Sequence, residues 1–329
     1  MSAHAFLPRT RLLALCAFLA LSGCSLLETR PDAGDAPQGR SEQPSQAEAE
    51  EDKGVEVGEM SAMRGLISAK ALENQANADY QALLKNARKK DALVSANDPR
   101  TRRLNAIAQR IIPFAKRFNP DIDEWKWEVN LIDSKDVNAF CMPGGKIAFY
   151  TGLIDTLKAT DDELAIVMGH EMAHALREHA RAQVAKSKAT SLGASLLGIL
   201  VSGGKYASAF DFAGNLLTLK FSRDDESEAD LVGLDLAARA GYDPRAGVSL
   251  WQKMEAASKS ALSLSWISTH PANANRIQNI EAQLPRVMPL YEKAQARMRE
   301  STAQAQQFPD TGRKRATPAS RKSAPGNKK

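Results

Sequence analysis

The chain has 329 residues, of which 43% are hydrophobic and 25% charged, and its formal net charge is +5. These values are ordinary for a globular protein, and the length allows one large domain with flanking tails. Residues 308–329 carry seven Lys or Arg and one Asp, so they account for the whole basic excess. The rest of the chain is close to neutral, which excludes nucleic-acid binding through a general basic field.

The N-terminus has the features of a secretory signal peptide over residues 1–23. A basic start with Arg9 and Arg11 precedes an apolar run and small residues. The tetrapeptide that ends in Cys24, Leu-Ser-Gly-Cys, resembles a bacterial lipobox, which predicts cleavage before Cys24 and acylation of that cysteine. A plain cleaved signal peptide is the alternative. Ser25 is not Asp, and by the enterobacterial sorting rule this indicates the outer membrane.

Two segments of biased composition flank the expected domain at 59–305. Residues 24–58 contain few large apolar side chains and much Pro, Gly, Glu, Gln and Ser, which predicts a disordered tether. Residues 306–329 form an expected basic, disordered tail, which either contacts anionic lipid or cell wall or is solvated without a partner. If Cys24 is acylated, Cys141 is the mature chain's only thiol and no internal disulfide can form.

The periodicity predicts helices first and then a small sheet. Helices are expected over 60–90 and over 99–118, the second beginning with Pro99 after Asp98. Residues 125–132 alternate large apolar and polar side chains, which predicts a strand with one buried face. Residues 137–152 predict an edge strand, a turn at Pro-Gly-Gly and a second strand. The pattern does not say which edge stays unpaired.

The stretch VMGHEMAHALREHA, residues 167–180, contains three of the five histidines. Thr160 and Glu163 form an expected capping box, and no Pro interrupts the expected helix to about residue 186. His170 and His174 are therefore one turn apart, so both imidazoles can reach one metal ion. Zinc suits such a pair, and Glu171 between them can take a proton from zinc-bound water.

A catalytic zinc site needs a third protein ligand from another element. Glu226 and Asp230 are four residues apart on a helix expected to begin near Ser222 and to end at Gly241. One of them can bind zinc while the other holds the second nitrogen of a histidine. The alternative is an acidic first helical turn with no metal.

Three further features have a structural interpretation. His179 is expected to face away from the pair and to be structural. Cys141 is expected to be a packed thiol rather than a nucleophile. The apolar segment 191–204 is too short and too glycine-rich for a transmembrane helix. It is expected to be a mobile flap over the cleft, with membrane contact as the alternative.

Four separated motifs together resemble one protease family. They are VNAFCMPGGKIAFYTGL, TDDELAIVMGHEMAHALREHA, FSRDDESEAD and STHPANANRI, within residues 99–282. In this order they resemble the HtpX/Oma group of gluzincin zinc metalloproteases, metallopeptidase family forty-eight, and its periplasmic BepA/LoiP/YcaL-like branch in a lipoprotein form. The resemblance implies an α+β fold: a mainly helical zincin-type metalloprotease domain with a small β-sheet that carries a substrate-binding edge strand.

The resemblance also implies roles for individual residues. It makes Glu171 the general base and Asp230 a support for a ligand. Asn138, Ala139 and Phe140 correspond to the substrate strand, although an ordinary core hairpin is the alternative. His270 corresponds to a histidine on an active-site loop that can occupy the fourth zinc position, whereas a helix start capped by Thr269 is the plain alternative. The implied ligands of one Zn²⁺ per chain are His170, His174 and Glu226.

The expected function is zinc-dependent endopeptidase action on unfolded or misassembled cell-envelope proteins, as quality control by an outer-membrane lipoprotein that faces the periplasm. The alternatives are an assembly factor or chaperone for outer-membrane proteins that uses the same groove, and a zinc hydrolase that is not a peptidase. A partner for the carbonyl oxygen beyond zinc is expected among His270, Arg276 and Tyr206.

Overall fold

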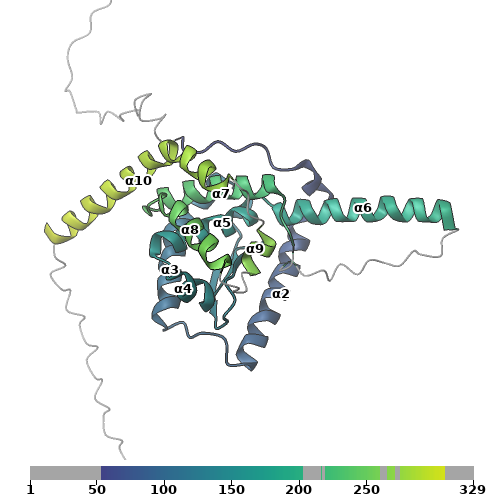
Figure 1. Cartoon of the computed structure of the whole chain (residues 1–329), viewed down its shortest axis with the longest axis horizontal. Helices are drawn as coiled ribbons and strands as arrows, with labels where there is room; N and C mark the ends of the chain where they lie inside the picture. The colour runs from purple at the N-terminus through teal and green to yellow at the C-terminus, as the bar shows by residue number, and fades with distance from the viewer. Residues whose placement is uncertain (1–52, 203–215, 217–218, 260–264, 271–274, 308–329) are drawn as a thin grey trace, which may run out of the picture. The chain divides into compact units, whose positions relative to one another are not determined.

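The computed structural model describes residues 53–202, 216, 219–259, 265–270 and 275–307. The expected signal peptide, Cys24, most of the tether, Tyr206 and the tail beyond residue 307 lie outside these residues. The described residues form mostly helices together with a three-stranded sheet (Figure 1). The expected α+β class, mainly helical with a small sheet, is confirmed.

The helices fall into two sets along the chain. Before the sheet lie η1 (Ala62–Leu66), α2 (Ala69–Lys89), α3 (Pro99–Ile111), η2 (Ile112–Arg117) and η3 (Pro120–Ile122). After it lie α4 (Thr151–Leu157), α5 (Asp161–Leu176), α6 (His179–Ser202), α7 (Arg223–Arg239), α8 (Ala246–Ser258), α9 (Ser265–Thr269) and α10 (Arg276–Gln307).

The sheet has the order β1-β3-β2, with β1 (Glu128–Ile132), β2 (Ala139–Met142) and β3 (Lys146–Tyr150). β3 is parallel to β1 and antiparallel to β2. The outer side of β1 is partly covered by a bridge between Leu93 and Ile132. Within the described part of the chain, β2 pairs only with β3, so β2 is the strand at the sheet edge.

The two faces of the sheet are covered by different helices. On one face Tyr80 of α2 is buried against Ala148 and Ile132, and its hydroxyl donates to the Ile147 carbonyl at 2.5 Å. On the other face Leu131, Ile147 and Phe149 join the main core with residues of α3, α5 and α7. The sheet therefore holds α5 beside β2, and the close packing of α5 against β2 fixes the geometry between them.

Capping and close packing position α5 and α7, the pair of helices at the centre of this core (Figure 1). Thr160 and Glu163 form the expected capping box at the start of α5, and Ser222 and Asp225 form another at the start of α7. The helices cross at Gly233, where an added Cβ would lie 2.7 Å from the amide nitrogen of His170. Only glycine allows this distance between the two backbones.

The helix expected to continue to residue 186 is in fact interrupted, so that expectation is wrong. α5 ends at Leu176, and Glu178 adopts a left-handed conformation with φ of 55° before α6 begins at His179. α6 then continues to Ser202, so glycines in the 191–204 segment do not end the helix before that residue. Within the described ranges, no helix has the length and apolar content needed to cross a membrane.

The body begins earlier than the expected boundary between tether and domain at 58/59. Val55 is only 4% exposed, and its amide donates to the Asp235 carboxylate at 2.9 Å. The Gly58 carbonyl accepts a hydrogen bond from Arg177, the residue that follows α5. Residues 53–58 are therefore bound to the domain, because hydrogen bonds and apolar burial offset the entropy of ordering them.

Candidate metal centre

Four buried side chains from three segments point toward one another. α5 supplies His170 and His174, α7 supplies Glu226, and His270 lies directly after α9. One ligand atom of each lies within 4.8 Å of the others. The Nε2 atoms of the α5 histidines are 3.1 Å apart, and Nδ1 of His270 is 2.9 Å from a Glu226 oxygen. The structure therefore brings the three expected ligands together and adds His270.

These distances suit a small tetrahedral ion. Ligand bonds of about 2.0–2.1 Å to zinc in a tetrahedron place neighbouring donor atoms about 3.3 Å apart. The separations from Nε2 of His170 are 3.3 Å to His270 and 3.6 Å to Glu226, and that from His174 to Glu226 is 3.4 Å. Two imidazoles and one carboxylate, with a fourth position near His270, form a donor set that fits zinc.

Each histidine of α5 has a partner for its second nitrogen. Asp230, one turn after Glu226, lies 3.0 Å from Nδ1 of His170. His179 lies 3.0 Å from Nδ1 of His174, and its own Nε2 contacts Glu228 at 2.9 Å. Such outer contacts fix the ring orientation and the tautomer of a metal ligand. The expectation that His179 faces elsewhere is wrong, because the interruption at residues 177–178 turns it back toward His174.

Arg276 contacts both carboxylates of α7 that belong to the centre, Glu226 and Asp230. Its guanidinium contacts Glu226 at 2.9 Å and Asp230 at 2.6 Å, and it lies 3.8 Å above the Trp251 ring. It is not among the residues that line the cleft containing Glu171. The geometry therefore suits Arg276 to positioning Glu226 rather than to contacting a substrate carbonyl oxygen.

The electrostatics favour the protonation states of His174 and Glu226 that a metal needs. Burial lowers the pKa of His174 well below its ordinary value, so the imidazole is neutral at pH 7. Burial alone would raise the pKa of Glu226, but hydrogen bonds with His174 and His270 lower it strongly. At Asp230, burial alone would also raise the pKa, but the charge of Arg276 and the hydrogen bond with His170 lower it. Neutral imidazoles and ionised carboxylates are the metal-binding forms.

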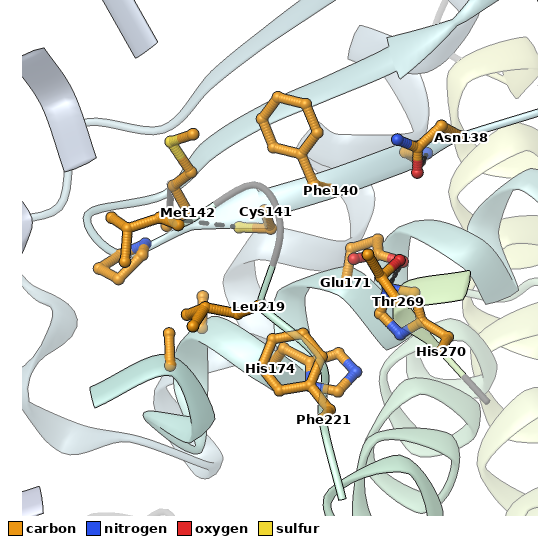
Figure 2. Close-up of a pocket in the computed structure, with 15 residues that line it drawn as sticks. Asn138, Phe140, Cys141, Met142, Glu171, His174, Leu219, Phe221, Thr269 and His270 are labelled. Atoms are coloured by element: carbon orange, nitrogen blue, oxygen red, sulfur yellow. Dashed lines mark hydrogen bonds and ion pairs between the residues drawn. The ribbon is translucent and has the colours of Figure 1, made fainter. Parts of the chain in front are cut away.

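Glu171 lies beside this cluster and faces the cleft (Figure 2). One oxygen, Oε1, accepts a hydrogen bond of 2.5 Å from the indole N–H of Trp266, and Nε2 of His270 lies 3.6 Å from the same atom. Sequence reasoning missed Trp266. The one signal that could have indicated it is spacing: Trp266 lies four positions before His270, one helical turn away.

The cleft runs between β2 and the metal donors. Figure 2 shows β2 passing opposite Glu171, His174 and His270, and Cys141 of this strand also lines the cleft. The Phe221 ring stacks on His174 at 3.9 Å, and Leu219 also lines the cleft. Among the expected substrate-strand residues, Asn138, Ala139 and Phe140 all line it. Burial raises the pKa of the Cys141 thiol, which suits a packed thiol rather than a nucleophile.

Among the described residues, no strand pairs with the side of β2 that faces away from β3, and this side lies along the cleft. The Tyr150 amide donates to the Asn138 carbonyl, and Phe140 is paired with Ala148. Because bonded pairs alternate along an antiparallel ladder, the backbone groups of Ala139 and Cys141 point away from β3. The Ala139 amide donates to the side chain of Asn138 at 3.0 Å.

Comparison with known proteins identifies the family to which this site belongs. The sequence profile described as peptidase family M48 matches residues 98–284, which is more than half of the chain. The chain belongs to this family. The M48 match contains α5 and α7 with their candidate metal donors, the sheet and His270, and M48 metalloproteases use zinc, the metal that the donor set fits.

Named relatives of this M48 chain are metalloproteases. Mitochondrial metalloendopeptidase OMA1 of Schizosaccharomyces pombe is 33% identical over 204 residues, which cover 59% of this chain and 56% of that protein. Metalloprotease LoiP of Escherichia coli is 31% identical over 180 residues, covering 54% and 70%. Metalloprotease YcaL of the same organism is 27% identical over 179 residues, covering 54% and 69%. The chain spans about half the length of most of its OMA1 relatives, from 56% of the S. pombe protein down to 30% of the Arabidopsis thaliana protein.

Proposed function

We propose that this M48 chain is a zinc-dependent endopeptidase. The observation that carries the proposal is the position of Glu171, a buried carboxylate between the donors of His170 and His174 and the cleft beneath β2. When bound, zinc supplies a Lewis acid that polarises the scissile carbonyl and acidifies a water molecule. His170, His174 and Glu226 hold one ion per chain, and Asp230 and His179 orient the imidazoles.

Glu171 moves the proton. One carboxylate oxygen contacts Trp266, so the other is available to accept a proton from water in the cleft. The same carboxyl group then delivers that proton to the leaving amine, which requires it to lie within reach of both atoms. Its burial strengthens these interactions because little water competes for them.

The edge of β2 binds the substrate as an added strand. The outward carbonyl groups of Ala139 and Cys141 and the amide of Cys141 pair with an extended peptide, which places its backbone across Glu171. Main-chain pairing tolerates many side chains but requires an extended segment. This requirement favours unfolded or misassembled proteins as substrates.

The location and substrates belong to the proposal. LoiP and YcaL are E. coli metalloproteases, and together with the N-terminal signal and Cys24 they support an acylated outer-membrane lipoprotein facing the periplasm. Cell-envelope proteins that fail to fold or assemble are then the available substrates, and the activity is quality control. The alternative is an assembly factor or chaperone that uses the β2 edge and cuts rarely.

His270 gates the site in this proposal. Its Nδ1 lies among the ligand atoms, 2.9 Å from Glu226 and 3.3 Å from Nε2 of His170. An imidazole in this position occupies the place that water needs, so the site is latent until the segment with His270 moves.

The decisive experiment compares the wild type with Glu171→Gln, both as full-length chains purified in detergent. We expect about one zinc per chain in each, and cleavage of unfolded casein by the wild type that a chelator abolishes. Loss of the base should reduce the rate at least ~100-fold. Glu255→Gln, which changes a carboxylate that is 62% exposed, is the matched control and should cut normally. Undiminished cleavage by Glu171→Gln would refute the proposal.

Rescue in cells separates the protease from the chaperone. Glu171→Gln keeps the zinc ligands and the β2 edge, so a chaperone would still function with it. We expect that this variant fails to restore envelope quality control in a deletion strain and that uncut substrates accumulate on it. Full rescue by the variant would favour the assembly-factor alternative.

A further inference from the structure

Trp266 contacts one oxygen of Glu171, the proposed general base, and takes no part itself in the proton transfers described above. It is the largest fully buried side chain in the described part of the chain, with 1% of its surface exposed. Its indole N–H donates to Oε1 of Glu171 at 2.5 Å across 95 residues of sequence. A buried, charge-assisted hydrogen bond of this kind constrains a carboxylate strongly because no water replaces it.

The donor itself is held from three directions. The Trp266 amide donates to the Val137 carbonyl at 3.1 Å, and the Trp266 carbonyl accepts from the His270 amide at 2.8 Å. The indole ring stacks on the His270 ring, with centroids 4.9 Å apart and planes 28° from parallel. Val137 immediately precedes the substrate-strand residue Asn138. The indole N–H is therefore fixed relative to both the strand and the metal donors.

We propose that Trp266 is the positioning residue of the general base. Its N–H holds Oε1, so that Oε2 of Glu171 stays directed at the water and at the leaving amine. Without this bond, the buried carboxylate has a second rotamer available and an oxygen without a donor. The proposal rests on the proposed role of Glu171, and it assigns to Trp266 no contact with the substrate.

The kinetic test replaces the donor while it keeps an aromatic ring. Trp266→Phe should lower kcat about 10- to 100-fold, the effect of losing a hydrogen bond to a charged group. KM and the zinc content should stay within about twofold, because the β2 edge and the ligands are unchanged. The matched control is Trp125→Phe, which removes an indole N–H bond of 2.9 Å to Glu73 outside the site and should leave kcat within about twofold.

A double variant separates positioning from general packing. If Trp266 acts only through Glu171, then adding Trp266→Phe to Glu171→Gln should not reduce the residual rate further. If the ring merely supports the fold, the two losses should multiply. Multiplying losses, or a wild-type kcat in Trp266→Phe, would overturn the proposal.

An isosteric replacement covers the case in which Trp266→Phe fails to fold. Benzothienylalanine at position 266 keeps the fused rings and replaces the N–H group with sulfur. We expect the same loss of kcat with an unchanged thermal transition. A kcat equal to that of the wild type in this protein would show that the N–H group is not needed, and would overturn the proposal.

Nuclear magnetic resonance tests the contact without any activity. Labelling with ¹⁵N-tryptophan gives one indole N–H signal for each of the four tryptophans, and Trp266→Phe identifies its own. In Glu171→Ala this signal should shift upfield, while the Trp125 signal should shift in Glu73→Ala instead. If the Trp266 signal does not move in Glu171→Ala, the positioning role of Trp266 is wrong, whatever the activity of the protein. If the signal moves but the wild-type protein cleaves no peptide, the proposed function is wrong, while the contact between Trp266 and Glu171 stands.

Discussion

Gly169 and Gly233 cross with their backbones in contact, since a Cβ on Gly169 would lie 2.7 Å from the Gly233 carbonyl oxygen. His170 immediately follows the first of these glycines, and Asp230 lies one turn before the second. The crossing therefore sets the distance between the histidines of α5 and the carboxylates of α7. Neither glycine chelates a metal, yet the metal centre depends on both.

Gly233→Ala should destabilise the fold and weaken zinc binding together. The added methyl group meets backbone atoms, which cannot rotate away, so α5 and α7 must separate at a cost of about 1–3 kcal/mol. Urea unfolding and zinc content give the two readouts. Gly65→Ala, where the added methyl group meets nothing within 4 Å, is the control and should change neither. A Gly233→Ala protein with normal zinc content would contradict this account of the crossing.

Glu228→Gln should weaken zinc binding although Glu228 lies outside the cluster of metal donors. Burial alone would raise its pKa, but the hydrogen bond with His179 and the charge of Arg177 lower it, so Glu228 is an anion that orients His179. His179 in turn orients His174. Loss of an outer contact of this kind costs about 10-fold in metal affinity, which competition with a chromophoric chelator measures. Asp224→Asn, at an exposed position of the same helical turn, should bind zinc normally.

Cys141→Pro should raise KM with little change in kcat. The Cys141 amide points away from β3, so proline removes a donor to the added substrate strand while the bonds to β3 remain. Cys141→Ala keeps the amide and is the matched control, with a KM within about twofold of the wild type. Hydrolysis of one fluorogenic peptide gives both constants. Equal KM values for the proline and alanine variants would mean that the substrate does not pair with this edge.

His270→Ala should raise the basal rate of hydrolysis by the purified protein. The side chain lies among the donor atoms, and its removal leaves that position to water. The increase should appear in kcat at an unchanged zinc content of about one per chain. A fall in kcat would instead assign His270 to stabilising the transition state, and the gating proposal would then be abandoned.

Local sequence signals predicted the elements that depend on neighbouring residues. The capping box at Thr160, the helix start near Ser222, the strands near 125–150 and the helix with both α5 histidines follow from patterns within a few residues. The resemblance to a protease family, rather than spacing, distinguished Glu226 from Asp230. These elements could be predicted from local patterns because capping and periodicity are short-range effects.

The rest depends on contacts between distant segments. Glu178 adopts φ of 55° without being Gly or Asn, so nothing local predicted the interruption that turns His179 toward His174. Val55 bonds to Asp235 across 180 residues, and Trp266 bonds to Glu171 across 95. Each of these contacts is set by how helices pack in the core, which a single sequence does not encode in any local pattern.

The last prediction concerns Glu163 of the α5 capping box. The carboxylate is buried, with 2% of its side chain exposed, and burial alone would raise its pKa. Hydrogen bonds from Lys253, the Thr160 amide and Ser249 outweigh burial and lower the pKa below the ordinary value. Because the folded pKa is lower than the unfolded one, the contribution of Glu163 to stability is complete above about pH 4.5 and is lost as the pH falls through the folded value.

Glu163→Gln can still cap the helix but loses the charge opposite Lys253, which is 36% exposed, so we expect a loss of about 1 kcal/mol at pH 7. Urea unfolding in the presence of a chelator should show that difference at pH 7 and a smaller one at pH 3, which lies below the unfolded pKa. Glu255→Gln, which changes a carboxylate that is 62% exposed, should show no such difference at either pH. An equal loss for Glu163→Gln at both pH values would mean that the lost charge is not the cause and that the amide simply packs less well.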